Sequence, residues 1–315
     1  CNPKSDRTGE KMKNILIIKS CEDSFERYYN EKLRECGCVV QNSLDYKPRE
    51  GKTFSVRGIK QLLSIDADSL RQYQIIIVFE EVRLIPFLKL RAPKKTKIIL
   101  WNWNLKNKTI QKKEKVVQPF CEIWTFDPGD ARKYGWRLNN QFYCPIEIEN
   151  RKEKVRSRKN AFCACQDKGR YKILKEIYKQ LTARNIDCNF TLVKQIGNEY
   201  DENDQWVKEN GMPYDEFLQC TIDSDIIIDL VRDGQVGITV RTLEALFYNK
   251  KLITNNSAVK ELPLYNPRNI FIWGVDEMPK LDIFLNTPYD EVPQEIKNQY
   301  TIGKWLDTFD NSGLE

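Results

Sequence analysis

The sequence contains no histidine among its 315 residues. Histidine is the usual general base near neutral pH and the commonest metal ligand, so any acid–base catalyst here must be a carboxylate, tyrosine, lysine or cysteine. The sequence also lacks long apolar runs, and Ile75–Phe79 and Ile226–Ile228 are among the longest. We therefore predict no membrane-spanning segment.

Ten cysteines are present, but no two of them form a Cys-x-x-Cys pair. The closest pairs, Cys36 with Cys38 and Cys163 with Cys165, are spaced too tightly for a typical zinc site. Residues two apart on a strand share a face, which favours reduced thiols packed in a core. We predict no metal site and a cytoplasmic location, where thiols stay reduced.

The length favours two domains, and a hydrophobic content of 41% with a net charge of +6 indicates a globular protein suited to phosphorylated ligands. Short apolar runs such as Ile15–Ile18 and Lys97–Trp101 alternate with amphipathic stretches such as Ser24–Cys36 and Tyr171–Leu181. Such alternation is typical of βαβ units with a parallel sheet. The expected fold class is α/β, with two Rossmann-like domains facing a cleft.

The expected domain boundaries follow changes in composition, with a polar start before Met12 and a charged stretch near position 150. They divide the chain into a disordered extension or tag remnant (1–11), an N-terminal Rossmann-like domain (12–147), a linker (148–158), a C-terminal Rossmann-like domain (159–289) and a helical segment packing back on the first domain (290–315).

The segment Ile226–Asn256 carries the strongest functional pattern. A buried strand ends near Asp229, a loop with two glycines follows, and a helix is expected to start near Thr239. One face of that helix is apolar and predicted to be buried: Leu243, Leu246 and Phe247. Another face is polar and carries Arg241, Glu244 and Tyr248, of which Arg241 and Glu244 are predicted to point outward. A glycine loop before a helix is an anion site, although spacing alone also fits an ordinary helix with an Arg241–Glu244 pair.

The residue order Gln235-x-Gly237-x-Thr239-x-Arg241-Thr, followed by Glu244-Ala-Leu and Lys-Lys-Leu-Ile-Thr, resembles the donor-binding segment of bacterial GT-B glycosyltransferases, in particular those of lipopolysaccharide or capsule biosynthesis. The resemblance implies that a nucleotide-sugar diphosphate contacts Gly237, Ile238, Thr239 and Arg241. It also implies that Glu244 binds the ribose. Many such enzymes carry a second glutamate eight residues earlier; the chain departs from that pattern, and Gln235 is expected to contact the sugar instead.

A second motif, Lys168-Gly169-Arg170, follows the first strand of the second domain. A lysine and an arginine flanking a glycine at a strand-to-helix turn can clamp a leaving diphosphate, and GT-B enzymes often place such residues near this loop. A solvated charged turn is the alternative interpretation.

Two groups of first-domain residues follow predicted strands. Trp101, Asn102 and Trp103 could contact a sugar acceptor by stacking and hydrogen bonding, or could belong to a buried strand end. Glu80, Glu81 and Asp127 are candidates for the base that deprotonates an acceptor hydroxyl, although Asp127 also suits a helix start.

The resulting hypothesis is a metal-independent glycosyltransferase with no cofactor beyond its nucleotide-sugar co-substrate. Its expected partners are a nucleotide-diphosphate sugar and a glycan or lipid-linked glycan acceptor of the bacterial surface. Lysines at 94–97 and 106–115 allow peripheral contact with anionic lipid, whereas the lack of interleaved aromatics argues against nucleic acid. The alternatives are a GT-B fold that binds a nucleotide or glycan without catalysis, and a different nucleotide-using enzyme such as an epimerase.

Overall fold

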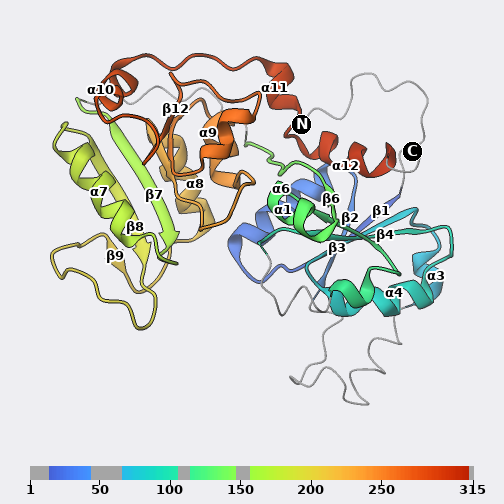
Figure 1. The fold of residues 1–315 in the computed structure, drawn as a ribbon. Coiled ribbons are helices and arrows are strands. Elements are labelled where there is room, and N and C mark those ends of the chain that lie inside the picture. The colour runs from blue at the N-terminus through green and yellow to red at the C-terminus, as the bar shows by residue number, and fades with distance from the viewer. Residues whose placement is uncertain (1–13, 44–65, 106–113, 147–156, 312–315) are drawn as a thin grey trace. The chain divides into compact units, whose positions relative to one another are not determined.

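The computed structural model describes four stretches of the chain: residues 14–43, 66–105, 114–146 and 157–311. Their contacts form two compact units, Cys1–Asn139 and Asn140–Glu315 (Figure 1). The predicted extension 1–11 and most of the predicted linker 148–158 lie outside the described residues.

The first unit is built on a six-stranded parallel sheet in the order β2-β1-β3-β4-β5-β6. Its strands are β1 (Ile15–Lys19), β2 (Val39–Asn42), β3 (Ile75–Phe79), β4 (Lys97–Asn102), β5 (Glu122–Thr125) and β6 (Arg137–Leu138). Its helices are α1 (Ser24–Glu35), α3 (Ala67–Leu70), the 3-10 turn η2 (Val82–Leu84), α4 (Ile85–Arg91) and α6 (Pro128–Tyr134). Every residue of β3 is buried, as expected for a central strand with both faces covered.

Local sequence explains where the helices of this unit begin and end. Asp23 caps α1 by accepting a hydrogen bond from the Glu26 amide at 2.7 Å. Asp127 caps α6 in the same way, and Gly135 ends that helix in the left-handed conformation at φ 68°. These caps place the residues after β1 and β5 in fixed turns at the carboxyl edge of the sheet.

The second unit is also built on a six-stranded parallel sheet, ordered β12-β11-β10-β7-β8-β9. Its strands are β7 (Asn160–Gln166), β8 (Asp187–Val193), β9 (Val207–Lys208), β10 (Ile226–Asp229), β11 (Lys251–Thr254) and β12 (Ile270–Ile272). Its helices are α7 (Tyr171–Thr182), α8 (Tyr214–Asp223), α9 (Val240–Phe247), the 3-10 turn η3 (Ser257–Glu261), α10 (Pro279–Asn286), α11 (Gln294–Asn298) and α12 (Ile302–Asn311). Numbered within the unit, this is the Rossmann order 3-2-1-4-5-6.

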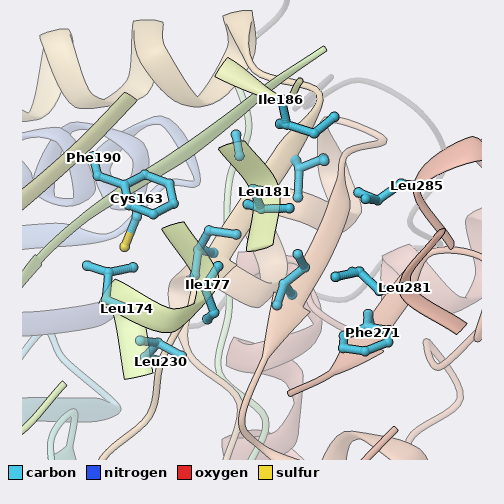
Figure 2. Packing of buried hydrophobic residues seen from close by; sticks show 14 of the residues in the cluster. Cys163, Leu174, Ile177, Leu181, Ile186, Phe190, Leu230, Phe271, Leu281 and Leu285 are labelled. Atoms are coloured by element: carbon cyan, nitrogen blue, oxygen red, sulfur yellow. The ribbon is translucent and has the colours of Figure 1, made fainter. Parts of the chain in front are cut away.

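The core beside β7 and β10 is contributed largely by α7 and α10 (Figure 2). Leu174, Ile177 and Leu181 recur every three or four residues on α7 and are fully buried. Leu281 and Leu285 of α10 belong to the same cluster. This packing holds the central strands whose carboxyl ends carry the predicted site residues.

Within the second unit, residues 142–143 contact the C-terminal segment of the chain. Phe142 packs on Trp305 of α12 with ring centroids 4.3 Å apart, and the Tyr143 amide donates to the Tyr300 carbonyl at 2.8 Å. Residues 142–143 and the C-terminal helix therefore form one substructure.

Among the described residues, no helix has the length and apolar character needed to cross a membrane.

Replacing Ile177 by alanine should lower the free energy of unfolding by about 2–5 kcal/mol, because it leaves a cavity in the core of the second unit. Ile283→Ala is the matched control: Ile283 is 66% exposed, and its replacement should change stability by less than about 0.5 kcal/mol. Urea denaturation of both variants measures the difference. Equal effects would contradict the described packing.

Candidate functional site

The strand order of the second unit reverses between β7 and β10. β8 and β9 lie on one side of β7, whereas β10, β11 and β12 extend from its other edge. In open parallel sheets a crevice forms at such a reversal, outside the carboxyl ends of the strands. The turn after β7 and the loop after β10 both begin at this edge, and they contain the two strongest motifs of the sequence.

A buried carboxylate shapes the turn after β7. Asp167 accepts hydrogen bonds from the Tyr171 amide at 2.9 Å, from the Asn198 side chain at 2.7 Å and from the Tyr200 hydroxyl at 2.7 Å. The next two residues adopt left-handed conformations, with φ 41° at Lys168 and 87° at Gly169. The turn is therefore held from beneath, and the Lys168 side chain is exposed.

Three cations gather at the strand-order reversal. Partial desolvation of its ammonium lowers the pKa of Lys168, and the nearby charges of Arg232 and Arg170 lower it further. Burial and the charge of Arg170 likewise lower the pKa of Arg232. Arg170 donates one bond to the Gln166 carbonyl at 3.0 Å, but its Nε is buried without a hydrogen-bond partner. Within the described residues no carboxylate forms an ion pair with any of the three.

Mutually repelling cations held at one edge of a sheet are stabilised when an anion binds between them. The arrangement therefore suits a multiply charged ligand such as a diphosphate. Lys168, Gly169 and Arg170 lie in the turn after β7, where Arg170 and Arg232 are near enough to lower the pKa of Lys168. The structure adds Arg232, which sequence reasoning did not select because a lone arginine in a loop carries no pattern.

Two asparagines hold the loop after β10 in place. The Asn255 side chain accepts from the Val231 amide at 2.7 Å and donates to the Val231 carbonyl at 3.2 Å. Asn256 donates to the carbonyls of Val236 and Gly237. Gln235, the predicted sugar contact, donates from its side-chain Nε2 to the Gly237 carbonyl at 3.1 Å. The loop is thus held by the two asparagines that follow β11 and by a hydrogen bond between two of its own residues.

The helix predicted to start near Thr239 does so, with Thr239 as its N-cap. The Thr239 hydroxyl accepts from the Arg241 amide at 2.9 Å and donates to Asp229 at 2.7 Å. Thr242 donates to the same carboxylate at 2.8 Å, and burial raises the pKa of Asp229. Leu243 of the predicted apolar stripe is fully buried. Asp229 therefore joins the end of β10 to the first turn of α9.

The predicted outward face of α9 is wrong. Glu244 is fully buried, accepts from the Tyr214 hydroxyl at 2.9 Å and pairs with Arg241, and burial raises the pKa of its carboxyl. Arg241 also lies over the Phe217 ring, with its guanidinium carbon 3.5 Å from the centroid. Tyr248 is buried as well. Tyr214 and Phe217 of α8 contact Glu244 and Arg241, whereas Tyr248 bonds to the Tyr143 hydroxyl and the Ile146 amide. Glu244 is therefore not placed to meet a ribose in this structure.

The first-unit carboxylates differ in their surroundings. Glu80 follows β3 at φ 60°, and its carboxylate accepts from the Asn104 amide at 2.8 Å. Glu81 pairs with Arg83 at 3.1 Å. Asp127 is buried and accepts from the Asp130 amide at 2.9 Å, the structural role expected of a helix cap. Glu80 alone stands in a left-handed backbone, which for a non-glycine residue marks local strain.

The predicted acceptor contacts are largely internal. Trp101 and Asn102 are fully buried because β4 continues through Asn102 instead of ending before it. Trp103 is half-buried, and its ring lies 5.1 Å from that of Tyr29. Trp101 and Asn102 therefore match the alternative of a buried strand end, and of these three residues only Trp103 has exposed surface.

A buried lysine at the end of β1 escaped the sequence analysis. Lys19 is 4% exposed, and burial lowers its pKa although Glu26, Asp23 and Glu80 raise it. Its ammonium lies 5.8 Å from the ring of Trp103. The order of the first sheet reverses between β1 and β3, so Lys19 and Glu80 flank the crevice of that unit.

No protein family matches the sequence, and no curated protein is similar to it. Solved structures are similar in fold. An α-glucosyltransferase in complex with UDP and a 13-mer DNA is 12% identical, with a TM-score of 0.56, and the match covers 95% of this chain and 98% of that chain. UDP-GlcNAc 2-epimerase from Methanocaldococcus jannaschii is 12% identical over the same shares, with a TM-score of 0.51. The fold is thus α/β with two Rossmann-like units of the GT-B kind, as predicted.

Acidification should remove the stabilising contribution of Asp167. Burial alone would raise its pKa, but hydrogen bonds from Tyr200, Asn198 and the backbone lower the pKa overall. A lowered folded-state pKa gives stability that is present above the unfolded value of about 3.9 and is lost as the pH falls below it. The stability difference between wild type and Asp167→Asn should therefore shrink between pH 7 and pH 3 in urea denaturation.

The exposed Glu202→Gln serves as the control for that experiment, and its difference from wild type should stay small at both pH values. A stability difference for Asp167→Asn that is the same at both pH values would contradict the assignment.

Removing one cation should weaken anion binding. Arg232→Gln is expected to lower the affinity for inorganic diphosphate about tenfold, because a hydrogen bond to a charged group contributes about 1.5–3 kcal/mol. Titration calorimetry at fixed ionic strength measures the change. Arg268→Gln, at an exposed arginine of the same unit, is the matched control for net charge. Equal losses in both variants would show only a general charge effect.

Proposed function

We propose that this protein is a glycosyltransferase that moves a sugar from a nucleotide-diphosphate donor to a hydroxyl of a bacterial surface glycan. The observation that carries the proposal is the cluster of Lys168, Arg170 and Arg232 at the β7–β10 reversal, beside the N-terminus of α9. These groups would neutralise the charge that develops on a departing diphosphate, so the transfer would need no metal.

The fold supports the same class of ligand. One similar structure was solved with UDP, and the other is named for a UDP-sugar. In the proposed donor complex the diphosphate would meet Lys168, Gly169 and Arg170 on one side. On the other side it would meet the loop and helix start at 237–239 and the side chain of Arg241. Gln235, on the same loop, is the proposed contact for the donor sugar.

The proposed reaction forms one bond and breaks one. The acceptor oxygen attacks the anomeric carbon, the bond from that carbon to the phosphate oxygen breaks, and the nucleoside diphosphate leaves with the electron pair. A base must take the proton of the acceptor hydroxyl. We assign this role to Glu80, which follows β3 where the strand order of the first sheet reverses and accepts neutral hydrogen bonds from Asn104. Asp127 instead caps a helix from a buried position, and Glu81 is paired with the cation of Arg83.

The proposed acceptor is a glycan or a lipid-linked glycan that meets the first unit. Trp103 is the aromatic side chain there with exposed surface beside Lys19, and aromatic rings stack on sugar rings. Exposed Lys94 and Lys95 would favour peripheral contact with anionic lipid.

The burial of Glu244 favours a second candidate, a GT-B fold that binds a nucleotide or glycan without catalysis. In that case the anion site would work as described, but no sugar would leave the donor. Turnover, as opposed to binding, separates the two functions.

A panel of UDP-, GDP- and CDP-sugars, assayed for donor hydrolysis and for transfer to glycan acceptors, tests the proposal. At least one donor should be cleaved, and Arg170→Ala should lower the rate about 10²–10³-fold, as the loss of one group that stabilises developing charge does in other enzymes. Arg268→Ala should retain the wild-type rate. Nucleotide binding without turnover of any donor would support the binding protein instead, and full turnover in Arg170→Ala would remove Arg170 from the mechanism.

A further inference from the structure

Arg241 occupies an electrostatically unfavourable position. It is the second residue of α9, directly after the N-cap Thr239 and Val240. The N-terminus of a helix carries partial positive charge, so a cation in the first turn is disfavoured and an anion is favoured. Two contacts keep the arginine there: its guanidinium lies 3.5 Å above the centre of the Phe217 ring, and it pairs with Glu244.

Glu244 makes a closed set of contacts. One carboxylate oxygen accepts from the Tyr214 hydroxyl at 2.9 Å, and the other accepts from the Arg241 guanidinium. The side chain is 0% exposed. A ribose could reach this carboxylate only by displacing both partners, whereas the Arg241 side chain is 24% exposed and keeps further N–H donors.

We infer that Glu244 is a positioning residue, which together with Tyr214 and Phe217 holds Arg241 at the start of α9 so that its remaining donors bind the diphosphate. The inference rests on the proposed function and deepens it, because it gives Glu244 a role in phosphate binding through Arg241 in place of direct contact with the ribose. Glu244, one turn into the helix, pairs with the guanidinium through one carboxylate oxygen, and the Phe217 ring supports the face of the guanidinium.

Removing the Glu244 carboxylate should change the affinity for an anion in opposite directions, depending on whether the residue acts only through its charge or by positioning Arg241. Glu244 carries negative charge near an anion site, so its removal would tighten anion binding if only net charge mattered. If the carboxylate instead orients Arg241, its removal frees a long side chain and binding weakens. Inorganic diphosphate has no ribose, so a residue that binds only ribose would not affect it.

The experiment is a double-mutant cycle on the affinity of the full chain for inorganic diphosphate, measured by titration calorimetry. Glu244→Gln should weaken binding about tenfold in the wild-type background and by less than about twofold in the Arg241→Gln background, because its effect passes through the arginine. Tyr214→Phe keeps the ion pair and removes one hydrogen bond to Glu244, so it should weaken binding about two- to fivefold. This milder variant also provides the test if Glu244→Gln fails to fold.

Several outcomes overturn the inference. Unchanged or tighter diphosphate binding in folded Glu244→Gln would do so and would leave the proposed function standing. Equal losses in both backgrounds would show that Glu244 acts independently of Arg241. A wild-type protein that binds neither diphosphate nor any nucleoside diphosphate would overturn the proposed function together with the inference.

Discussion

The reversal of strand order between β7 and β10 is the constraint on which the second unit's chemistry depends. Because parallel strands joined by right-handed crossovers extend away from each other at this point, the segments that leave β7 and β10 diverge, which is where a crevice forms in open parallel sheets. Lys168 and Arg170 approach this edge from one strand and Arg232 from the other. No side-chain pattern along a single segment could assemble these charges.

Two buried carboxylates, those of Asp229 and Glu244, hold the first turn of α9 in position. Asp229 ties the end of β10 to the first turn of α9 through two threonine hydroxyls, and Glu244 pairs with Arg241 under the cover of α8. Burial raises the pKa of both carboxyls, whereas the charge of Arg241 acts in the opposite direction on each. Asp229 and Glu244 thus bind groups inside the second unit. The cations at the edge of the sheet remain able to bind an anion from solution.

The first unit also has a reversal of strand order, but with different chemistry. Its order reverses between β1 and β3, where Lys19 ends β1 and Glu80 follows β3, with Asp23 and Glu26 nearby. This crevice is therefore rich in carboxylates, whereas that of the second unit is rich in cations. Such a contrast agrees with the proposed division of labour, in which one unit holds the diphosphate and the other deprotonates a hydroxyl.

The sequence by itself determined the class of fold and most of its elements, because strands buried on both faces and capped helices leave strong local patterns. Ile75–Phe79 forms the predicted strand, and α9 starts after Thr239 as expected. Short edge strands such as Val207–Lys208 and the helix Pro279–Asn286 went unpredicted, since two residues carry no periodicity and a helix with mixed polarity carries little.

Within the site, residue spacing located the turn at Lys168–Arg170 and the loop before α9, because both follow buried strands. Only the tertiary structure decided that Arg232 joins them and that Glu244 lies buried against Tyr214. Both outcomes arise from contacts between segments far apart in the chain. A helical pattern shows which residues of α9 share a face, but it contains no information about which neighbouring helix will cover that face.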